Sequence, residues 1–271
     1  MAPIVHLVRH AQGYHNLSTE NHSLPDPDLT DLGKQQCADL QKNFPYHSQV
    51  ELVVASPIRR TIYTALLGFE PVFQAHPDTK LICLPEAQEA SDAPCDTGSD
   101  PEVLRKEFEG NKIPVDLSLV QDGWNSKTGK WSPTPRALRK RAREVRRWLR
   151  SRPEKEIVLV THGGILHYIT EDWEDYSAYQ GTGWTNAEYR TFKFSDTLHK
   201  EDLEGKPLED SDDATLVETP ESRQRRGQTP EPPSREEMRA LYRKGLEEWT
   251  EEEPRDEAKV PEGQEIDGAR V

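Results

Sequence analysis

Short apolar segments alternate, up to residue 194, with longer segments that have the periodicity of helices. Four segments of strand length are bounded by polar turns, at residues 4–8, 51–56, 80–84 and 156–161. Three helical patterns lie between them, at residues 30–44, 56–69 and 135–153. Strands that alternate with helices in this order indicate parallel pairing with helical crossovers. The sequence therefore predicts an α/β fold of three layers, in which a mixed, mostly parallel sheet is flanked by helices.

Local signals refine this prediction at three places. Thr30 is the expected N-cap of the first helix, and Ser56 with Pro57 marks the expected start of the second. Residues 187–194 alternate between apolar and polar side chains, which predicts a further strand. We expect that strand to be antiparallel and to lie at an edge of the sheet.

The composition changes near residue 199. Residues 200–271 hold 22 acidic against 12 basic side chains, and the part up to residue 234 is rich in Pro, Ser and Thr. Such a composition is typical of a linker or flexible tail, so we expect a main domain over 1–199 and an acidic, Pro-rich extension over 200–271. Ser234 and Glu237 form a capping-box pattern, which predicts a short helix at about 235–250 that docks on the main domain.

Charge and cysteine content narrow the class of protein. The net charge of −14 argues against a nonspecific nucleic-acid binder, because the global field repels phosphate backbones, but it permits a local basic pocket. The three cysteines show neither a CxxC pair nor zinc spacing, which indicates reduced thiols. With no apolar segment of membrane-spanning length, we expect a cytoplasmic protein without nucleic-acid or membrane partners. The residues do not identify a protein partner for the acidic extension.

Basic and imidazole side chains follow the ends of three predicted strands. Arg9 and His10 follow the first, Arg59 and Arg60 come soon after the second, and His162 follows the fourth. In an open α/β sheet the carboxyl ends of the strands meet at one rim, where ligands bind. Because these strand ends carry no carboxylate, we expect an anion pocket whose forked guanidinium groups suit a phosphoryl group.

One of the two histidines could also react with that group. A neutral imidazole is a nucleophile near pH 7, and cationic neighbours lower its pKa. Phosphoryl transfer to histidine and then to water gives two easier steps, but the leaving oxygen needs a proton. Glu86 and Glu89 follow the third strand, and a desolvated glutamate beside phosphate has a raised pKa that suits a general acid. On chemistry alone, both glutamates are candidates.

At these positions the sequence resembles the histidine phosphatase superfamily, in its phosphoglycerate mutase-like branch. The segment LVRHAQGYHN resembles the signature LVRHGxxxxN, and LTDLGKQQ, SPIRRTIYTA, AQE and VTHGG resemble further family motifs in the family order. The resemblance implies the phosphoglycerate mutase-like fold. It also implies an enzyme that hydrolyses a small phosphorylated metabolite and needs neither a cofactor nor a metal.

The resemblance assigns roles to the basic residues. It implies that His10 is the phosphorylated nucleophile and that Arg9, Arg60 and His162 bind the phosphoryl group. The arginine four residues after the serine of SPxxR is Arg60, so the role of Arg59 stays open.

Further residues take their roles from the same motifs. Asn16 has the position of the family's phosphate-contacting asparagine, and the LxE register selects Glu89 over Glu86 as the proton donor. Gln12 and Gly163 lie inside the two histidine motifs and are candidates for substrate binding. The natural substrate does not follow from motifs that recognise only phosphate.

Other interpretations stay open. A mutase would return the phosphoryl group to a second hydroxyl, and a non-catalytic scaffold would bind phosphate without turnover. Histidines could instead hold a metal ion, in the sets His6, His10 and His15 or His162 and His167, although a spacing of four along a strand does not place ligands on one helical face.

Two other features have more ordinary interpretations. Trp124 and Trp131 flank a glycine-containing turn and could line a substrate pocket or cover an apolar edge. The basic side chains of residues 136–150 are expected to form a solvated helix surface.

Overall fold

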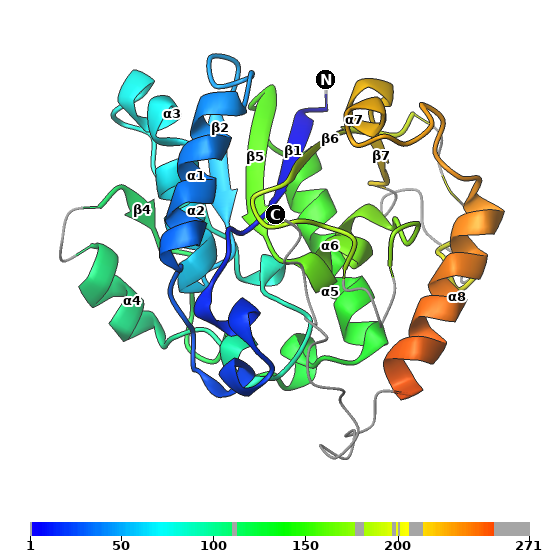
Figure 1. The fold of residues 1–271 in the computed structure, drawn as a ribbon, viewed down its shortest axis with the longest axis horizontal. Coiled ribbons are helices and arrows are strands. Elements are labelled where there is room, and N and C mark those ends of the chain that lie inside the picture. The colour runs from blue at the N-terminus through cyan, green and yellow to red at the C-terminus, as the bar shows by residue number, and fades with distance from the viewer. Residues whose placement is uncertain are drawn as a thin grey trace.

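The computed structural model describes residues 2–109, 113–176, 182–196, 199, 201–205 and 214–251, and for 248–251 the backbone only. The strands are β1 Ile4–Arg9, β2 Leu52–Ala55, β3 Leu81–Cys83, β4 Val115–Asp116, β5 Glu156–Thr161, β6 Tyr189–Phe194 and β7 Leu216–Glu218. The helices are α1 Asp31–Asn43, α2 Arg59–Gly68, α3 Glu70–Ala75, α4 Pro101–Phe108, α5 Pro135–Arg150, α6 Gly163–Thr170, α7 Pro220–Arg225 and α8 Arg235–Glu251. Figure 1 shows them as three layers, with the sheet between two groups of helices.

The strands form one mixed sheet in the order β4-β3-β2-β5-β1-β6-β7. Strands β4, β3, β2, β5 and β1 are parallel to one another, and β6 is antiparallel to both β1 and β7. The predicted α/β fold with a mostly parallel sheet is therefore confirmed. In the parallel part, neighbouring strands direct their carboxyl ends toward the same edge.

Apolar cores lie on both faces of this sheet. Because side chains alternate along a strand, Val5 and Leu7 of β1 join one core and Val8 joins the other. Helices α5, α6 and α8 supply residues to the first core, and α1, α2, α3 and α4 to the second. Burial on both faces explains why β5 is a continuous apolar run and why β1 is apolar around the buried His6.

The predicted helix starts are partly confirmed. The Thr30 side chain accepts a hydrogen bond from the backbone N–H of Gly33, so it caps α1 as expected. The second helix begins at Arg59 rather than at Ser56. The Ser56 hydroxyl instead accepts from the backbone N–H of Ile58 at 3.3 Å, which stabilises the turn ahead of the helix.

The strand at 189–194 differs from the prediction in its place. It is antiparallel, as expected, but β7 pairs with its outer side through Phe192 and Glu218, so β6 is not an edge strand. The expectation of a flexible linker is also wrong for residues 216–225, which form β7 and α7. Strand β7 has only three residues and lies within an acidic segment, so the sequence shows no alternation that would predict it. The domain boundary at residue 199 stays a prediction, and residues 252–271 of the extension lie outside the described residues.

The predicted docking of the C-terminal helix is confirmed. The Ser234 hydroxyl accepts from the backbone N–H of Glu237 at 3.3 Å, and the Glu237 carboxylate accepts from the Ser234 N–H at 2.8 Å. Met238 and Tyr242 of α8 are buried in the core that contains α5 and α6. Within the described residues, no helix combines the length and apolar character that crossing a bilayer requires.

The expectation that α5 has a solvated basic surface is only partly confirmed, because Arg136, Lys140, Arg147 and Arg150 are exposed but two other arginines are buried. Arg141 is 1% exposed and Arg146 is 5% exposed. Arg146 donates to the carbonyl of Tyr168 at 2.9 Å and pairs with Glu171 at 3.3 Å. Arg139 pairs with Glu204, so acidic residues of the extension cover part of this helix. The sequence pattern alone did not reveal which arginines of α5 are covered by residues that follow the helix in the chain.

Candidate active site

The predicted site residues gather at the carboxyl edge of the parallel strands. Arg9 ends β1 opposite Thr161, which ends β5, and the backbone N–H of His10 donates to the Thr161 carbonyl at 2.9 Å. The ring centroids of His10 and His162 lie 5.2 Å apart. Adjacent parallel strands thus bring together two histidines that are separated by 152 positions in the sequence.

His10 is held as a neutral imidazole in one tautomer. Its ring is buried, and Nδ1 donates a hydrogen to the carbonyl of Ala11 at 2.8 Å, so the lone pair lies on Nε2. Burial and then the positive charges of Arg60 and Arg9 hold the pKa of His10 well below its ordinary value. The amide of Asn186 donates to the His10 carbonyl at 3.1 Å and supports the backbone at this point. The uncharged Nε2 has the electronic state of a nucleophile.

The two arginines are anchored by backbone carbonyls. Arg9 Nη1 donates to the Trp184 carbonyl at 2.5 Å, and Arg60 Nη1 donates to the Cys95 carbonyl at 2.5 Å. Arg60 Nη2 also pairs with Asp96 Oδ1 at 2.8 Å. The strand ends carry no carboxylate, but Asp96 supplies one to Arg60 from further along the chain. Asp96 lies in a loop well after the third strand, and no sequence motif pointed to it.

His162 uses both ring nitrogens within this cluster. Its Nδ1 accepts from Arg60 Nη2 at 3.0 Å, so Nε2 carries the hydrogen and donates to the Ser56 hydroxyl at 2.9 Å. Burial and then the charge of Arg60 hold the pKa of His162 well below its ordinary value. Ser56, expected only to start a helix, therefore orients the second histidine.

The Glu89 side chain lies at the N-terminus of α6. This helix begins directly after His162. The Glu89 carboxylate accepts from the backbone N–H groups of Ala90 at 2.7 Å, Gly164 at 3.1 Å and Ile165 at 2.8 Å. Burial, and then the negative charge of Asp96, raise the pKa of Glu89, although the backbone donors oppose that shift. A carboxyl with a raised pKa at the start of α6 can hold a proton and release it.

Glu86 points elsewhere. Its carboxylate pairs with Lys130 Nζ at 2.6 Å, and the same ammonium pairs with Glu144 of α5 at 3.0 Å. Of the two candidate acids, the geometry brings Glu89 and not Glu86 to the N-terminus of α6, the helix that follows His162.

Asn16, Gln12 and Gly163 are held by local contacts. Asn16 Oδ1 accepts from the Gly13 N–H at 3.0 Å, and Gln12 Oε1 accepts from the Thr30 hydroxyl at 2.8 Å. Gly163 opens α6, where a Cβ atom would meet the Thr182 hydroxyl at 2.5 Å. The glycine is required there for close packing of the chain, and the binding roles of all three residues stay predictions.

Two further residues of the cluster were not predicted as part of a phosphate site. The ring of His15 lies 5.3 Å from that of His10, and burial lowers the pKa of His15. Lys127 Nζ donates to the Glu89 carbonyl at 3.3 Å, and burial lowers the pKa of Lys127 to about 8. Its backbone has φ 54°, a left-handed conformation that is costly for a residue with a side chain. No pattern around Lys127 in the sequence marks this position.

The metal and tryptophan interpretations find no support in the geometry. Among the described residues, no group of three or more His, Cys, Asp and Glu side chains has an arrangement that could hold a metal ion. His6 stacks on Tyr46 and hydrogen-bonds to Glu156 at the other end of β1. Trp124 is buried and donates to the Ser99 carbonyl at 3.3 Å, so it belongs to the core rather than to a pocket wall.

The fold and this cluster define an α/β protein that gathers histidines, arginines and a glutamate of raised pKa at the carboxyl edge of its sheet. The sequence model described as histidine phosphatase superfamily (branch 1) matches residues 5–199. The chain therefore belongs to the histidine phosphatase superfamily.

Curated relatives confirm the phosphoglycerate mutase-like branch. A phosphoglycerate mutase-like protein from Arabidopsis thaliana is 29% identical over 201 residues, which cover 60% of this chain and 72% of that protein. A protein of Schizosaccharomyces pombe described as a probable phosphatase is 29% identical over 164 residues, which cover 59% of this chain and 73% of that protein.

Solved structures resemble the chain more distantly. A phosphoserine phosphatase mutant from Entamoeba histolytica, in complex with phosphoserine, is 16% identical with a TM-score of 0.46. That alignment covers 80% of this chain and 95% of the other. Similarity at this level says nothing about the substrate of this protein.

Proposed function

We propose that this protein is a phosphatase that hydrolyses a small phosphomonoester through a phosphohistidine at His10. The observation that carries the proposal is the state of this imidazole. It is buried and neutral, with its Nδ1 hydrogen donated to the Ala11 carbonyl, so its Nε2 lone pair is available. The charges of Arg9 and Arg60 act on the same ring, which fits attack on an anionic phosphoryl group.

The reaction has two steps. His10 Nε2 attacks phosphorus, the bond from phosphorus to the ester oxygen breaks, and Glu89 donates its proton to the leaving oxygen. Water then gives a proton to Glu89 and attacks the phosphoryl group, and the phosphorus–nitrogen bond breaks to restore the lone pair on Nε2. Arg9, Arg60 and His162 bind the phosphoryl oxygens in both steps, which stabilises the charge that develops in the transition states.

The remaining predicted residues complete the binding of phosphate. Because Asn16 Oδ1 is held by the Gly13 N–H, we assign its amide Nδ2 as the donor to phosphate. In the same way we assign the amide nitrogen of Gln12 as a donor to phosphate, since its oxygen accepts from Thr30. We assign the backbone N–H of Gly163 as a further donor to phosphate, because it lies at the start of α6, where helix geometry favours anions.

The proposal includes a metal-independent reaction in a reducing, cytoplasmic setting. Protein groups supply the nucleophile, the acid and the positive charge, so no step needs a metal ion. Cys37, Cys83 and Cys95 are buried free thiols, which fits a reducing compartment.

The test is turnover of p-nitrophenyl phosphate in buffer with EDTA. Wild-type protein is expected to be active, and His10→Ala is expected to abolish both turnover and the acid-labile label left by a ³²P-labelled ester after rapid quenching. His76→Ala is the matched control, because this histidine is exposed and remote from the carboxyl edge of the sheet. Full activity of His10→Ala, or loss of activity in EDTA, would contradict the proposal.

The same protein preparation distinguishes the other interpretations. Formation of 2-phosphoglycerate from 3-phosphoglycerate would identify a mutase. Phosphate binding without turnover on a broad panel of esters would identify a scaffold. A panel of metabolite phosphates then ranks substrates by kcat/KM.

A further inference from the structure

Residues 182–188 hold the backbone on which the proposed nucleophile lies. The carbonyl of Trp184 accepts from Arg9 Nη1, and the amide of Asn186 donates to the His10 carbonyl. The N–H of Ala187 donates to the carbonyls of Arg9 and His10 at 3.1 and 3.2 Å. We call residues 182–188 the clamp segment.

The clamp segment is held in turn from its other side. Arg190 of β6 donates to the Gly183 carbonyl at 2.7 Å, and its guanidinium carbon lies 3.9 Å from the centre of the Trp184 ring. Gly183 has φ 67°, and a Cβ atom there would lie 2.3 Å from Asp175 Cβ. Asp175 and Arg190 therefore pack against Gly183 and Trp184, and the carbonyl of Trp184 holds Arg9.

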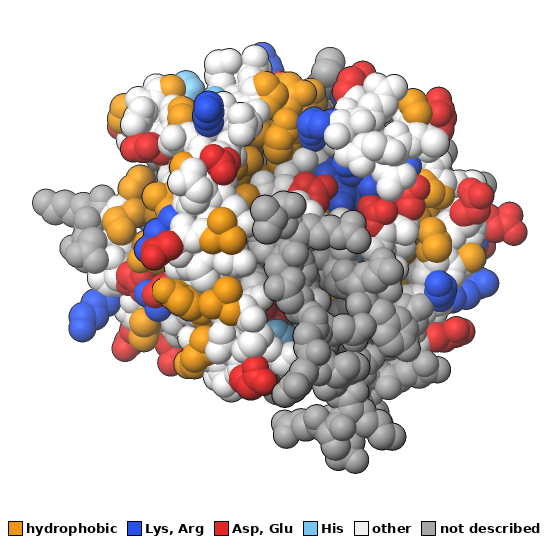
Figure 2. Space-filling model, in the orientation of Figure 1, with side chains coloured by type: hydrophobic (Ala, Val, Ile, Leu, Met, Phe, Trp, Pro, Cys, Tyr) orange, Lys and Arg blue, Asp and Glu red, His pale blue; other side chains and the backbone are white. Residues whose placement is uncertain are grey.

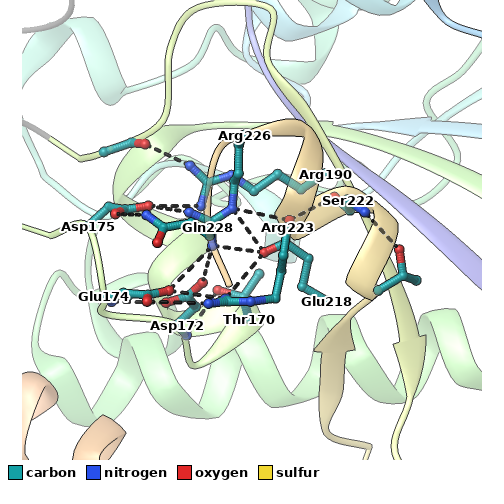
Figure 3. A network of polar contacts seen from close by, with 12 residues as sticks. Thr170, Asp172, Glu174, Asp175, Arg190, Glu218, Ser222, Arg223, Arg226 and Gln228 are labelled. Carbon is teal, nitrogen blue, oxygen red and sulfur yellow. Dashed lines mark hydrogen bonds and ion pairs between the residues drawn. The ribbon is translucent and has the colours of Figure 1, made fainter. Parts of the chain in front are cut away.

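Arg226, which directly follows α7, reaches this point from the extension (Figure 3). Its Nη1 pairs with Asp175 Oδ2 at 2.6 Å. Its Nε and Nη2 pair with the Glu218 carboxylate of β7 at 3.1 and 2.9 Å, and that carboxylate is 2% exposed. Arg190 Nη1 lies 3.7 Å from the same oxygen of Asp175. One planar guanidinium thus connects β7 to Asp175 with fixed geometry.

On the face drawn in Figure 2, basic and acidic side chains lie side by side below the position of α7 in Figure 1. The acidic groups next to Arg226 are Asp172, Glu174, Asp175 and Glu218. Arg226 is 12% exposed in its side chain, so water screens these interactions only in part. Because Arg226 is partly buried and pairs with several carboxylates, the connection that it makes between β7 and Asp175 has a defined geometry.

We propose that Arg226 is a positioning residue of the active site, acting through Asp175 and the clamp segment on Arg9 and His10. Arg226 lies outside the residues 5–199 that match the family. The extension is thereby part of the catalytic unit and not a dispensable tail. Since misplacement of a reacting group by about 1 Å can cost 100-fold in rate, removal of this connection lowers activity without touching a reacting atom. The effect on rate rests on the proposed function.

The experiment compares Arg226→Gln, Asp175→Asn and the double variant, with Arg226→Lys as a conservative change. Arg239→Gln is the matched control, because it removes another ion pair of the extension, with Glu201 at 3.0 Å, on α8. The readouts are kcat and KM for p-nitrophenyl phosphate and hydrogen exchange of the amides in 182–188. Circular dichroism verifies that each variant is folded under the assay conditions.

Arg226→Gln and Asp175→Asn are each expected to lower kcat/KM by about 10- to 100-fold, with faster hydrogen exchange in 182–188. The double variant is expected to lose no more than the single variants, because both break one connection. Arg226→Lys should recover part of the loss, and Arg239→Gln should match wild type.

Unchanged hydrogen exchange at 182–188 in Arg226→Gln would overturn the inference whatever the activity. Losses in kcat/KM that multiply in the double variant would overturn it too, because they would show independent effects. Absence of turnover by wild-type protein would instead count against the proposed function, while the exchange data would still report whether Arg226 holds the clamp segment.

Discussion

Replacement of Glu89 by glutamine tests the proposed acid most directly. The carboxylate accepts from three backbone N–H groups, those of Ala90, Gly164 and Ile165. In the same orientation, a glutamine oxygen keeps the first and third of these, because both reach Oε1, but its NH₂ group then faces the N–H of Gly164. An unsatisfied buried donor costs about 1–3 kcal/mol, so we expect Glu89→Gln to lower the free energy of unfolding by about that amount.

The effect on rate should depend on the leaving group. A positioned general acid contributes roughly 10²- to 10⁴-fold, which corresponds to about 3–5 kcal/mol of activation free energy. Glycerol 2-phosphate has an alkoxide leaving group that needs this proton, and its phosphorylation of His10 should slow by that factor. p-Nitrophenolate leaves without a proton, so the same step with p-nitrophenyl phosphate should slow by at most about tenfold.

Rapid-quench measurement of the phosphohistidine burst is the appropriate assay, because it reports the first step alone. Glu89 also acts in the hydrolysis step, which would mask the difference in steady-state rates. Glu86→Gln is the matched control, since Glu86 pairs with Lys130 and should leave both bursts unchanged. Equal slowing of the two esters by Glu89→Gln, or a leaving-group-dependent loss in Glu86→Gln, would refute the assignment.

Three more changes have defined outcomes. Asp96→Asn removes a negative charge that raises the pKa of Glu89, so the acid loses its proton at lower pH and the alkaline limb of the kcat profile should move to lower pH; a shift to higher pH would contradict this. Lys127→Met removes a buried ammonium whose pKa is about 8 against an ordinary 10.5. In urea unfolding it should therefore raise stability by on the order of 3 kcal/mol below pH 8, and the gain should disappear as the pH approaches 10.5; no gain at pH 7 would refute it. Tyr242→Ala should lower the free energy of unfolding by about 3–5 kcal/mol, because this ring is 1% exposed in the core beneath α8, and a change below 1 kcal/mol would mean that α8 does not dock.

Much of the fold could be predicted because its signals are local. The apolar runs at 4–8 and 156–161 become neighbouring strands, and Thr30 caps α1 as its side-chain chemistry requires. The rule that parallel strands share a carboxyl edge was enough to bring His10 and His162 together. Element starts were less certain, as at Arg59, because a turn of three residues has weak sequence preferences.

The sequence by itself determined the residue types at the strand ends, the family and the alternation of strands with helices, since period and motif are properties of consecutive residues. Only the tertiary structure decided that Asp96 pairs with Arg60, that Glu89 and not Glu86 lies at the N-terminus of α6, and that Arg226 of the extension pairs with Asp175. These are contacts between residues far apart in the chain. Such contacts depend on how whole elements pack, because burial and ion pairing are set by the neighbours that the completed fold supplies.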